Sequence, residues 1–508
     1  MNPDLLDELK VAVDPGGWTS DSEALEPHLT EWRKAVRGRT ALMLWPSTTA
    51  QVSTIVRICA RHGVGLVPQG GNTGLCGGAI PDDSGEQILM SLSRLNEIRN
   101  MAPDNFSVTV GAGCVLADIQ AAAREIGLLF PLSLAAEGSC QIGGNLSTNA
   151  GGINVIRYGT ARDQVLGLEV VLADGTVWDG LRALRKDTAG YDLKQLFLGS
   201  EGTLGIITAA TLKLYPDPGE TLTAMLAMPS AASAAGLLGL LRGRFADRIQ
   251  AFELMSERCL RLVTRHIPDT RHPFESAYDW YALIEVVAGG GQEAVEAALV
   301  EAMERNLVKD AIVAKSAAET EALWRLRHSI SEAQKPEGAC LKHDIAVPIG
   351  EIARFLERGE ALVGQMQPEA RLVAFGHVGD GNLHYDVLQP QGANGADFLR
   401  DALPALDEVD HLVRRRALVH ARPVAHERDA GEVLDGKPAG IPVAASVDAA
   451  VTLVSATFAQ GTPCTSGGTP VVVSCELGAI ASGNNVTGTI VVTAPVVEVT
   501  ETIDNSVS

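Results

Sequence analysis

The amino-acid sequence predicts an α+β protein with two mixed units and a short all-β C-terminal tail. Helical and strand patterns alternate through most of the chain, which is typical of layered mixed folds. Pro216 and Pro218 interrupt this alternation and mark a boundary between the two units. From residue 446 onwards, short alternating runs of Val, Thr, Ser, Ala and Gly are typical of strands. At 508 residues, the chain is too long for a single hydrophobic core.

The first unit begins with a helix and a strand that leads directly into glycine-rich sequence. Ser47 and Gly63 are typical of the start and the end of that helix. No G-x-G-x-x-G motif opens a helix after the strand, which argues against a Rossmann unit. We expect a helix over residues 47–63, a strand over 64–68, and a strand followed by a helix over 107–127. A hairpin over 165–180, turning at Asp174 and Gly175, and a closing strand over 203–214 complete this unit.

The second unit alternates strands with longer helices, which predicts an antiparallel α+β layer of the split βαβ type. A helix over residues 317–333 would place Arg327 and Ser331 one turn apart on the same face. Lys342 follows in a strand-like segment, before a hairpin over residues 373–387. The preceding strands are expected over 221–229, 280–288 and 311–316, with helices over 231–242 and 291–306.

The hairpin "VAFGHVGDGNLHYDV" carries two histidines on either side of Asp380 and Gly381. Asp-Gly between alternating apolar residues is a strong signal for a two-residue turn. That turn would place His377 opposite His384, with Cβ atoms about 5 Å apart, close enough for both imidazoles to bind one metal ion. A catalytic zinc site usually needs a third protein ligand. A cross-strand histidine pair at a sheet edge is the alternative.

The composition limits the partners and the compartment. The chain has 41 Lys and Arg against 62 Asp and Glu, a formal charge of -21, which argues against nucleic acid or an anionic membrane as the main partner. No segment approaches the about 18 uninterrupted apolar residues of a membrane span, and the acidic N-terminus lacks a signal-like apolar core. The eight cysteines form no CxxC pair, so we expect reduced thiols in a cytoplasmic protein.

Two glycine-rich segments in the first unit are candidates for phosphate binding. They read "PQGGNTGL" over residues 68–75 and "PLSLAAEGSCQIGGNLSTNAGG" over residues 131–152. Glycine with Ser, Thr and Asn lets backbone N–H groups converge on phosphate oxygens without obstruction by side chains. Two such loops in one domain would enclose a pyrophosphate from both sides, whereas a single one would be read as an ordinary turn.

Together with "RYG" at 157–159 and "GSEGTLGIIT" at 199–208, these loops resemble the FAD-binding domain of the PCMH type, found in the vanillyl-alcohol oxidase superfamily. Within that superfamily, "LWRLRHSISEA", "LKHDIAVP" and "FGHVGDGNLH" resemble motifs of the FAD-linked D-2-hydroxyglutarate and D-lactate dehydrogenases. The resemblance implies an N-terminal segment over 1–37, an FAD-binding domain over 38–216 and a substrate-binding cap domain over 217–414.

The resemblance implies roles for the matched residues of the flavin domain. The first loop contains no histidine to attach the flavin, so FAD is expected to bind noncovalently. The residues implied to bind the FAD pyrophosphate are Pro68, Gly70, Gly71, Asn72, Thr73, Gly74 and Leu75. Those implied to line the diphosphate and the isoalloxazine are Pro131, Ser133, Gly138, Ser139, Gly143, Gly144, Ser147, Thr148, Asn149 and Gly152, with Glu201, Gly202 and Ile207 near the adenine end.

In the cap, the resemblance implies that the substrate is a D-2-hydroxyacid, oxidised to the 2-oxoacid by hydride transfer to flavin. Its carboxylates would be held by Arg327, Ser331 and Lys342, and an arginine fork suits a planar carboxylate. A solvated helical arginine is the alternative for Arg327. His377 and His384 match two ligands of zinc or another divalent metal, and Asn382 a neighbouring polar contact. The metal would act as a Lewis acid on the 2-hydroxyl.

The resemblance leaves two properties open. The electron acceptor is a quinone, a flavoprotein or a cytochrome in relatives. Arg327 and Lys342 together slightly favour a dicarboxylate, but D-lactate, glycolate and D-malate remain alternatives to D-2-hydroxyglutarate. The oligomeric state is equally open, with a homodimer among the alternatives.

The C-terminal part departs from the family. The third metal ligand and the catalytic base are expected from a Glu-His motif near 420–430, where this chain has His426 and Glu427 in reversed order. Residues 415–445 predict an irregular junction. The tail over 446–508 resembles half of a DUF11 cell-surface repeat, in which Cys464 and Cys475 could pair only in an oxidising compartment. The chain is therefore read as an impaired dehydrogenase, or alternatively as an inactive flavin-binding fusion whose tail serves in surface adhesion.

Overall fold

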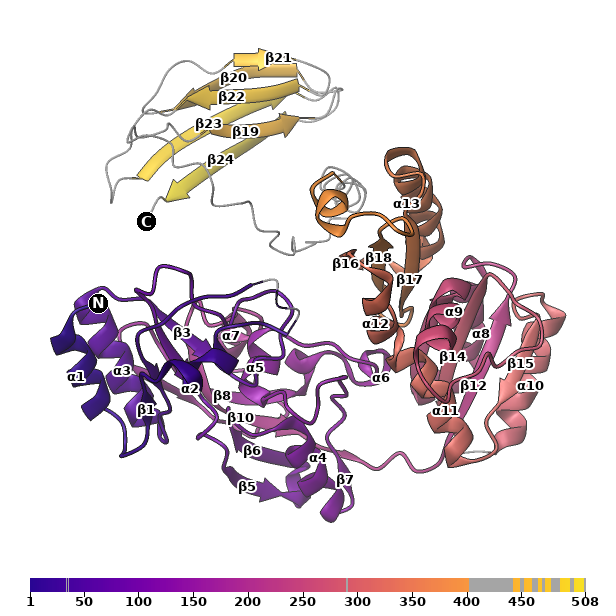
Figure 1. The fold of residues 1–508 in the computed structure, drawn as a ribbon, viewed down its shortest axis with the longest axis horizontal. Coiled ribbons are helices and arrows are strands. Elements are labelled where there is room, and N and C mark those ends of the chain that lie inside the picture. The colour runs from indigo at the N-terminus through magenta and orange to yellow at the C-terminus, as the bar shows by residue number, and fades with distance from the viewer. Residues whose placement is uncertain are drawn as a thin grey trace. The chain divides into compact units, whose positions relative to one another are not determined.

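The computed structural model describes residues 1–401, apart from residues 33, 35, 289 and 290, and six strands within residues 442–506. Contacts divide the chain into two compact units, Met1–Ala425 and His426–Ser508. Within the first unit, an N-terminal domain with two principal sheets is followed by a second domain, the predicted cap, built on one seven-stranded sheet (Figure 1). None of the described helices combines the length and the hydrophobicity needed to cross a membrane.

The N-terminal domain contains two principal sheets. The first has the order β1-β2-β4-β3, and its strands β2, β4 and β3 are parallel to one another. The second is antiparallel, with the order β5-β6-β10-β8-β9. These strands are β1 (Trp18–Thr19), β2 (Met43–Leu44), β3 (Leu66–Gln69), β4 (Ile88–Ser91), β5 (Ile98–Ala102), β6 (Ser107–Gly111), β8 (Val165–Val171), β9 (Val177–Gly180) and β10 (Ile206–Lys213). A further pair joins β7 (Leu128–Leu129) to β11 (Tyr215–Pro216).

Helix α3 (Thr49–His62) shows why the local sequence forms the predicted element. The side chain of Thr48, one residue after the expected Ser47, caps the first turn by accepting a hydrogen bond from the Gln51 amide. Gly63 ends the helix in the left-handed conformation, with φ of 64°, as predicted. The other helices are α1 (Pro3–Val11), α2 (Ser22–Leu25), α4 (Leu116–Glu125), α5 (Ile142–Ser147), α6 (Val155–Tyr158) and α7 (Lys194–Phe197).

The cap is built on a seven-stranded antiparallel sheet with the order β15-β12-β14-β13-β17-β18-β16. Its first four strands have the connectivity of the predicted split βαβ layer. The strands are β12 (Thr221–Met228), β13 (Ile249–Ser256), β14 (Trp280–Val287), β15 (Asp310–Val313), β16 (Cys340–Ala346), β17 (Arg371–His377) and β18 (Asn382–Leu388). The sequence reading did not include β13, which lies between β14 and β17.

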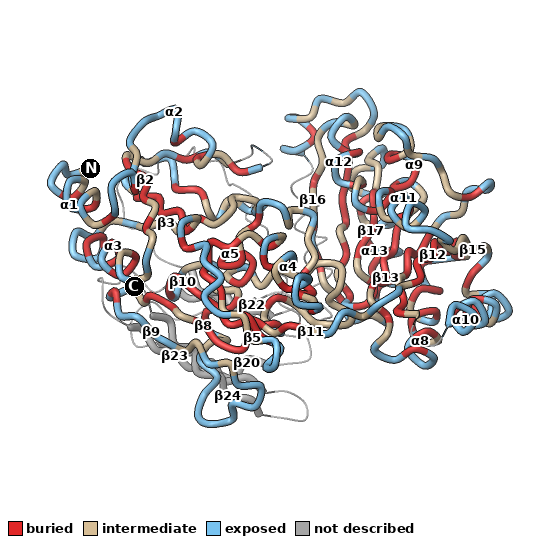
Figure 2. The backbone as a smooth tube through the Cα atoms, turned by 90° about the horizontal axis from the view of Figure 1, so that it is seen from below, coloured by how far each residue is buried: buried red, intermediate tan, exposed pale blue. Residues whose placement is uncertain are grey.

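Helices cover both faces of this sheet. One face packs against α8 (Ser233–Phe245), α10 (Gln292–Glu304) and α13 (Ile352–Met366). The other packs against α9 (Glu257–His266), α11 (Ala317–His328) and α12 (Ile330–Ala333). The helix predicted over residues 317–333 is thus interrupted at Ser329. Figure 2 shows the strands of the cap largely buried and the outer surface of α10 exposed.

All the described residues of the second unit lie in strands, in agreement with the predicted all-β tail. Its described strands form two antiparallel three-stranded sheets, with the orders β19-β22-β21 and β20-β23-β24. They are β19 (Pro442–Val447), β20 (Thr452–Phe458), β21 (Thr465–Gly467), β22 (Val471–Glu476), β23 (Asn485–Thr493) and β24 (Glu498–Ser506). Cys464 and the residues of the junction, including His426 and Glu427, lie outside the described residues.

Candidate active site

The two glycine-rich loops of the N-terminal domain lie against each other. A Cβ atom placed on Gly71 would lie 2.1 Å from the Ser139 carbonyl oxygen, and one placed on Gly70 would contact Gln141. Only glycine permits so close an approach of the two backbones. The structure therefore brings together the two segments that the sequence singled out for phosphate binding.

The segment "GSEGTLGIIT" at 199–208 also lies next to the two glycine-rich loops. The Glu201 amide donates a 2.9 Å hydrogen bond to the Ser147 carbonyl, at the end of α5. A Cβ on Gly202, where φ is 81°, would lie 2.9 Å from Pro68 Cγ. The predicted flavin residues are placed as follows: Pro68 at β3; Gly70, Gly71, Asn72, Thr73, Gly74 and Leu75 in the first loop; Pro131, Ser133, Gly138 and Ser139 in the second; Gly143, Gly144 and Ser147 on α5; Thr148, Asn149 and Gly152 after it; Glu201 and Gly202 in the third segment; and Ile207 on β10.

The residues present fit a cofactor with a pyrophosphate. A Cβ on Gly74, Gly138 or Gly144 would meet no atom within 4 Å, and Gly74 and Gly138 are exposed, so these glycines leave bare backbone next to open space. The side-chain oxygen Oε1 of Gln141 is buried near Gly70 and has no hydrogen-bond partner among the described residues. Backbone N–H groups next to open space and an unused polar atom are what a phosphate-bearing ligand needs.

One predicted flavin residue has a different contact from the one expected. Asn72 has a positive φ of 52°, and its side-chain amide donates to the Thr30 carbonyl at 3.1 Å. The side chain therefore fixes the first loop on the N-terminal segment, while its backbone remains in the glycine-rich turn.

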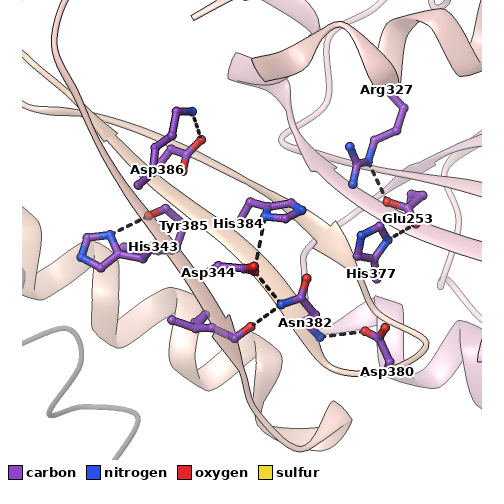
Figure 3. Close-up of polar contacts among 12 residues, drawn as sticks. Glu253, Arg327, His343, Asp344, His377, Asp380, Asn382, His384, Tyr385 and Asp386 are labelled. Carbon is purple, nitrogen blue, oxygen red and sulfur yellow. Dashed lines mark hydrogen bonds and ion pairs between the residues drawn. The ribbon is translucent and has the colours of Figure 1, made fainter. Parts of the chain in front are cut away.

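In the cap, three side chains form a buried network on one face of the sheet (Figure 3). Glu253 on β13 is fully buried. Its Oε2 accepts a hydrogen bond from Arg327 Nε at 2.6 Å, and its Oε1 lies 2.5 Å from His377 Nδ1. The register places Glu253 directly opposite His377, while Arg327 reaches the carboxylate from α11. Sequence reasoning missed Glu253, because it did not recognise β13.

A second carboxylate faces the other histidine. Nδ1 of His384 on β18 lies 3.4 Å from Asp344 Oδ1 on β16, and the two residues are opposite each other in the sheet. Asn382 donates to the same Asp344 oxygen at 2.7 Å and to the Ile345 carbonyl at 3.0 Å. Each histidine thus has its Nδ1 directed at a carboxylate, which leaves Nε2 of both rings for another ligand.

The hairpin differs from the prediction in its turn. His377 pairs with Asn382, and His384 pairs with Phe375, so the turn has four residues, Val378 to Gly381, instead of two. The predicted direct opposition of the histidines was therefore wrong. The two rings still lie on the same face as diagonal neighbours, with centroids 5.6 Å apart, because side chains alternate with a period of two along a strand.

The charges of this network fix the protonation of its members. Burial alone would raise the pKa of Glu253, but Arg327 and His377 lower it to about 2. Burial lowers the pKa of His377, but the Glu253 carboxylate outweighs this effect and holds the pKa above its ordinary value. Desolvation, Arg327 and His377 together lower the pKa of His384 to about 3. His384 is therefore neutral near pH 7 and carries a lone pair.

The remaining predicted substrate residues contact other partners than Glu253 or are exposed. Lys342 Nζ donates to Asp386 Oδ2 and to Gln334 Oε1, both at 2.9 Å, and Gln334 also donates to Asp386. Asp386 and Gln334 are buried, whereas the Lys342 side chain is 28% exposed. Ser331 lies on α12 and is exposed, whereas Arg327 is buried on α11.

The described residues fit a metal ion only in part. No group of three or more His, Cys, Asp or Glu side chains within the described part of the chain has the arrangement of a metal site. His377 and His384 supply two nitrogens. The residues expected to supply the third ligand, near 420–430, lie outside the described residues.

Comparison with known proteins identifies both domains of the first unit. A family model described as "FAD binding domain" matches residues 40–180, and one described as "FAD linked oxidases, C-terminal domain" matches residues 217–413. The mitochondrial D-2-hydroxyglutarate dehydrogenase of Danio rerio is 40% identical over 388 residues, which are 75% of this chain and 70% of that protein. The D-2-hydroxyglutarate dehydrogenase of Xanthomonas citri pv. viticola is 38% identical over 393 residues, 77% of this chain and 80% of that protein.

Solved structures share the fold at low identity. Alkyldihydroxyacetonephosphate synthase superposes with a TM-score of 0.64 at 15% identity, over 82% of this chain and 81% of that one. p-Cresol methylhydroxylase superposes with a TM-score of 0.61 at 15% identity, over 80% and 86% of the two chains. Both family matches end before the tail, so its resemblance to a DUF11 repeat stays a prediction.

Proposed function

Because the chain belongs to the family of FAD-linked oxidases that includes the D-2-hydroxyglutarate dehydrogenases, we propose that it oxidises a D-2-hydroxyacid to the 2-oxoacid in an FAD-dependent reaction. FAD would bind noncovalently between the two glycine-rich loops, residues 68–75 and 131–152, which we call the flavin cradle. There it would accept the hydride from the substrate carbon. The electron acceptor that reoxidises it would be a quinone, a flavoprotein or a cytochrome.

The observation that carries this proposal is a buried arginine beside two imidazoles on one face of the cap sheet. Glu253 engages only Nε of Arg327, so the terminal nitrogens of the guanidinium remain for a substrate carboxylate. The position of that guanidinium is further fixed by the ring of Phe375, 4.8 Å from Arg327 Cζ. The substrate carboxylate would thus be held next to His377 and His384.

We also propose that His377 and His384 bind a divalent metal through Nε2. Support comes from the carboxylates at both Nδ1 atoms, since such partners orient histidine ligands in metal sites. The metal would lower the pKa of the substrate hydroxyl. The described residues supply these two ligands.

A second candidate function is a flavin-binding protein without turnover. One observation favours it: the reversed order of His426 and Glu427 where a Glu-His motif is expected. Loss of a general base typically lowers a rate by about 10²- to 10⁴-fold, so this reading predicts flavin binding with little or no oxidation.

Anaerobic mixing of the purified protein with single hydroxyacids separates these functions. We expect a yellow protein whose flavin absorbance is bleached by D-2-hydroxyglutarate or D-lactate and not by the L-enantiomers. Arg327→Lys should slow the bleaching, whereas Arg325→Lys, exposed on the same helix, should not. A yellow protein that no D-2-hydroxyacid bleaches would support the second candidate, and a colourless protein would refute both.

A further inference from the structure

Helix α6 of the N-terminal domain lies against the hairpin that carries the two histidines. A Cβ atom on Gly379, in the hairpin turn, would lie 2.5 Å from Ile156 Cδ1 and 2.6 Å from Ile156 Cβ. Ile156 also packs against the hydrophobic core of the cap, although it belongs to the other domain. On the same helix, Arg157 donates to Gln250 on β13 at 3.4 Å.

The cap side of this contact is rigid. Val378 is fully buried, and its amide donates to the Phe252 carbonyl at 3.1 Å, next to Glu253 in the sequence. Arg242 on α8 donates to the Gly379 carbonyl at 3.2 Å. The turn is therefore held from two elements of the cap, at the end of the hairpin where His377 lies.

The flavin side is equally fixed. Asn154, which precedes α6, donates from its side chain to the Pro131 carbonyl at 2.9 Å. The Ile153 amide donates to the Ser133 carbonyl at 3.2 Å. Pro131 and Ser133 belong to the second glycine-rich loop, so the segment that leads into α6 is tied directly to that loop. Figure 1 shows α6 between the N-terminal domain and the cap.

From these contacts we propose that Ile156 and Gly379 are positioning residues that set the distance between the flavin cradle and the substrate site. The inference rests on the proposed function, because hydride transfer needs the substrate carbon close to the flavin. A misplacement of about 1 Å can lower a rate by about 100-fold. A glycine is required at 379 for space alone, since its backbone lies outside the left-handed region.

The main test is the substitution Gly379→Ala, measured by flavin reduction in the stopped flow. The added methyl group must displace Ile156, so the reduction rate constant should fall about 10- to 100-fold. Flavin content should be unchanged, and the apparent dissociation constant of the hydroxyacid should stay within about threefold, because the contact touches neither ligand. Gly364→Ala on α13, where a Cβ meets no atom within 4 Å, is the matched control and should reduce at the wild-type rate.

A compensating substitution distinguishes spacing from general damage. Ile156→Gly alone removes the contact, including the Cβ, without a clash and should slow reduction with full flavin content. The double variant Ile156→Gly/Gly379→Ala should reduce faster than either single variant, because the methyl group added at position 379 enters the space that the whole isoleucine side chain, including its Cβ, has vacated. The proposal would be overturned if Gly379→Ala reduced at the wild-type rate or lost its flavin. It would also be overturned if the double variant did not reduce faster than each single variant. If Gly379→Ala fails to fold, an unchanged rate in Ile156→Gly overturns the proposal.

A readout without turnover keeps this inference separate from the proposed function. The unfolding midpoints of the flavin-loaded wild type, both single variants and the double variant form a double-mutant cycle. Contacting residues give non-additive changes, so the double variant should lose less than the sum of the single losses. Additive losses would overturn the contact. Failure of every D-2-hydroxyacid to reduce the wild type would refute the proposed function. The double-mutant cycle would still test the contact between Ile156 and Gly379, because unfolding midpoints do not depend on turnover.

Discussion

Oε1 of Glu253 lies 2.5 Å from Nδ1 of His377, although 123 residues separate them in the chain, and the other oxygen of the same carboxylate holds Arg327. One buried carboxylate thus fixes both a candidate substrate-binding cation and a candidate metal ligand. Removing one partner of a buried charge network usually costs more than the network contributes, because the remaining charges lose their compensation. Glu253 is therefore the residue on which the geometry of the site depends.

Glu253→Gln keeps the shape of the side chain and removes its charge. We expect flavin content to stay normal and the rate of flavin reduction by the hydroxyacid to fall about 10- to 100-fold, since Arg327 and His377 lose the group that orients them. Glu304→Gln, at the exposed end of α10, is the control and should have no effect. Normal reduction by Glu253→Gln would show that the carboxylate plays no part in positioning.

Metal binding can be tested without substrate. The chelator-treated protein should take up zinc, and His384→Asn should abolish tight uptake because it removes one of the two imidazole ligands. Asp344→Asn should weaken uptake by about 10- to 100-fold, as expected for a partner that orients a ligand. His62→Asn on α3 serves as the control. A wild-type protein that binds no zinc in equilibrium dialysis would refute the metal proposal.

Gly71→Ala tests the cradle. Its Cβ would lie 2.1 Å from a backbone oxygen, which cannot move as a side-chain end does. We expect the purified variant to contain less than about half of the wild-type flavin, because the two loops must separate. Gly350→Ala, where a Cβ meets open space, should retain its flavin. Absorbance of the released cofactor provides the measurement, and full flavin content in Gly71→Ala would contradict the closeness of the loops.

The acid stability of the cap should depend on Glu337. Hydrogen bonds from His266 and Arg371 and the charge of Arg371, against a smaller opposing effect of burial, lower the pKa of Glu337 from 4.5 to about 2. A carboxylate with a depressed pKa contributes stability that is present above its unfolded-state pKa and lost as the pH falls towards the folded-state value. Glu337→Gln should therefore cost on the order of 2 kcal/mol above about pH 5, and the difference from wild type should shrink towards pH 2. Urea midpoints at several pH values measure it, and a difference independent of pH would contradict the assignment.

The sequence predicted the fold well where the signals are local. Gly63 ends its helix as expected, and the hairpin over 165–180 forms as β8 and β9, since caps and turns depend on adjacent residues. The family resemblance supplied the flavin loops, whose convergence depends on backbone approach at Gly71. The strand β13 was missed because its apolar residues do not alternate cleanly.

The site was predicted only in part, because some of its contacts depend on residues that are distant in the sequence. His377 and His384 share a face, because any register change by whole pairs preserves the alternation of side chains along a strand. The turn length, however, was decided by Val378, which is buried in the cap core and hydrogen-bonded to Phe252, and no local signal reports that contact. Glu253 lies opposite His377, and Asp386 lies opposite Lys342, because their strands pair in the sheet, and a single sequence does not reveal this long-range pairing.

Asp386 should determine how strongly the site prefers a dicarboxylate. Lys342, expected to hold a substrate carboxylate, is already paired with Asp386 at 2.9 Å, and the carboxylate neutralises its charge. Asp386→Asn keeps the size of the side chain and its contact with Gln334 but releases the lysine charge. A charge-assisted hydrogen bond contributes roughly 1.5 kcal/mol, so the ratio of kcat/KM for D-2-hydroxyglutarate to that for D-lactate should rise about tenfold.

The comparison needs both substrates in the same preparation, because the ratio cancels differences in flavin content and active fraction. Asp83→Asn, exposed in the N-terminal domain, should leave the ratio unchanged. Lys342→Met in the Asp386→Asn background should return the ratio to its original value, since the gain depends on the released ammonium group. An Asp386→Asn ratio equal to or below that of the wild type would mean that Lys342 does not face the second carboxylate, and that Arg327 alone holds the substrate charge.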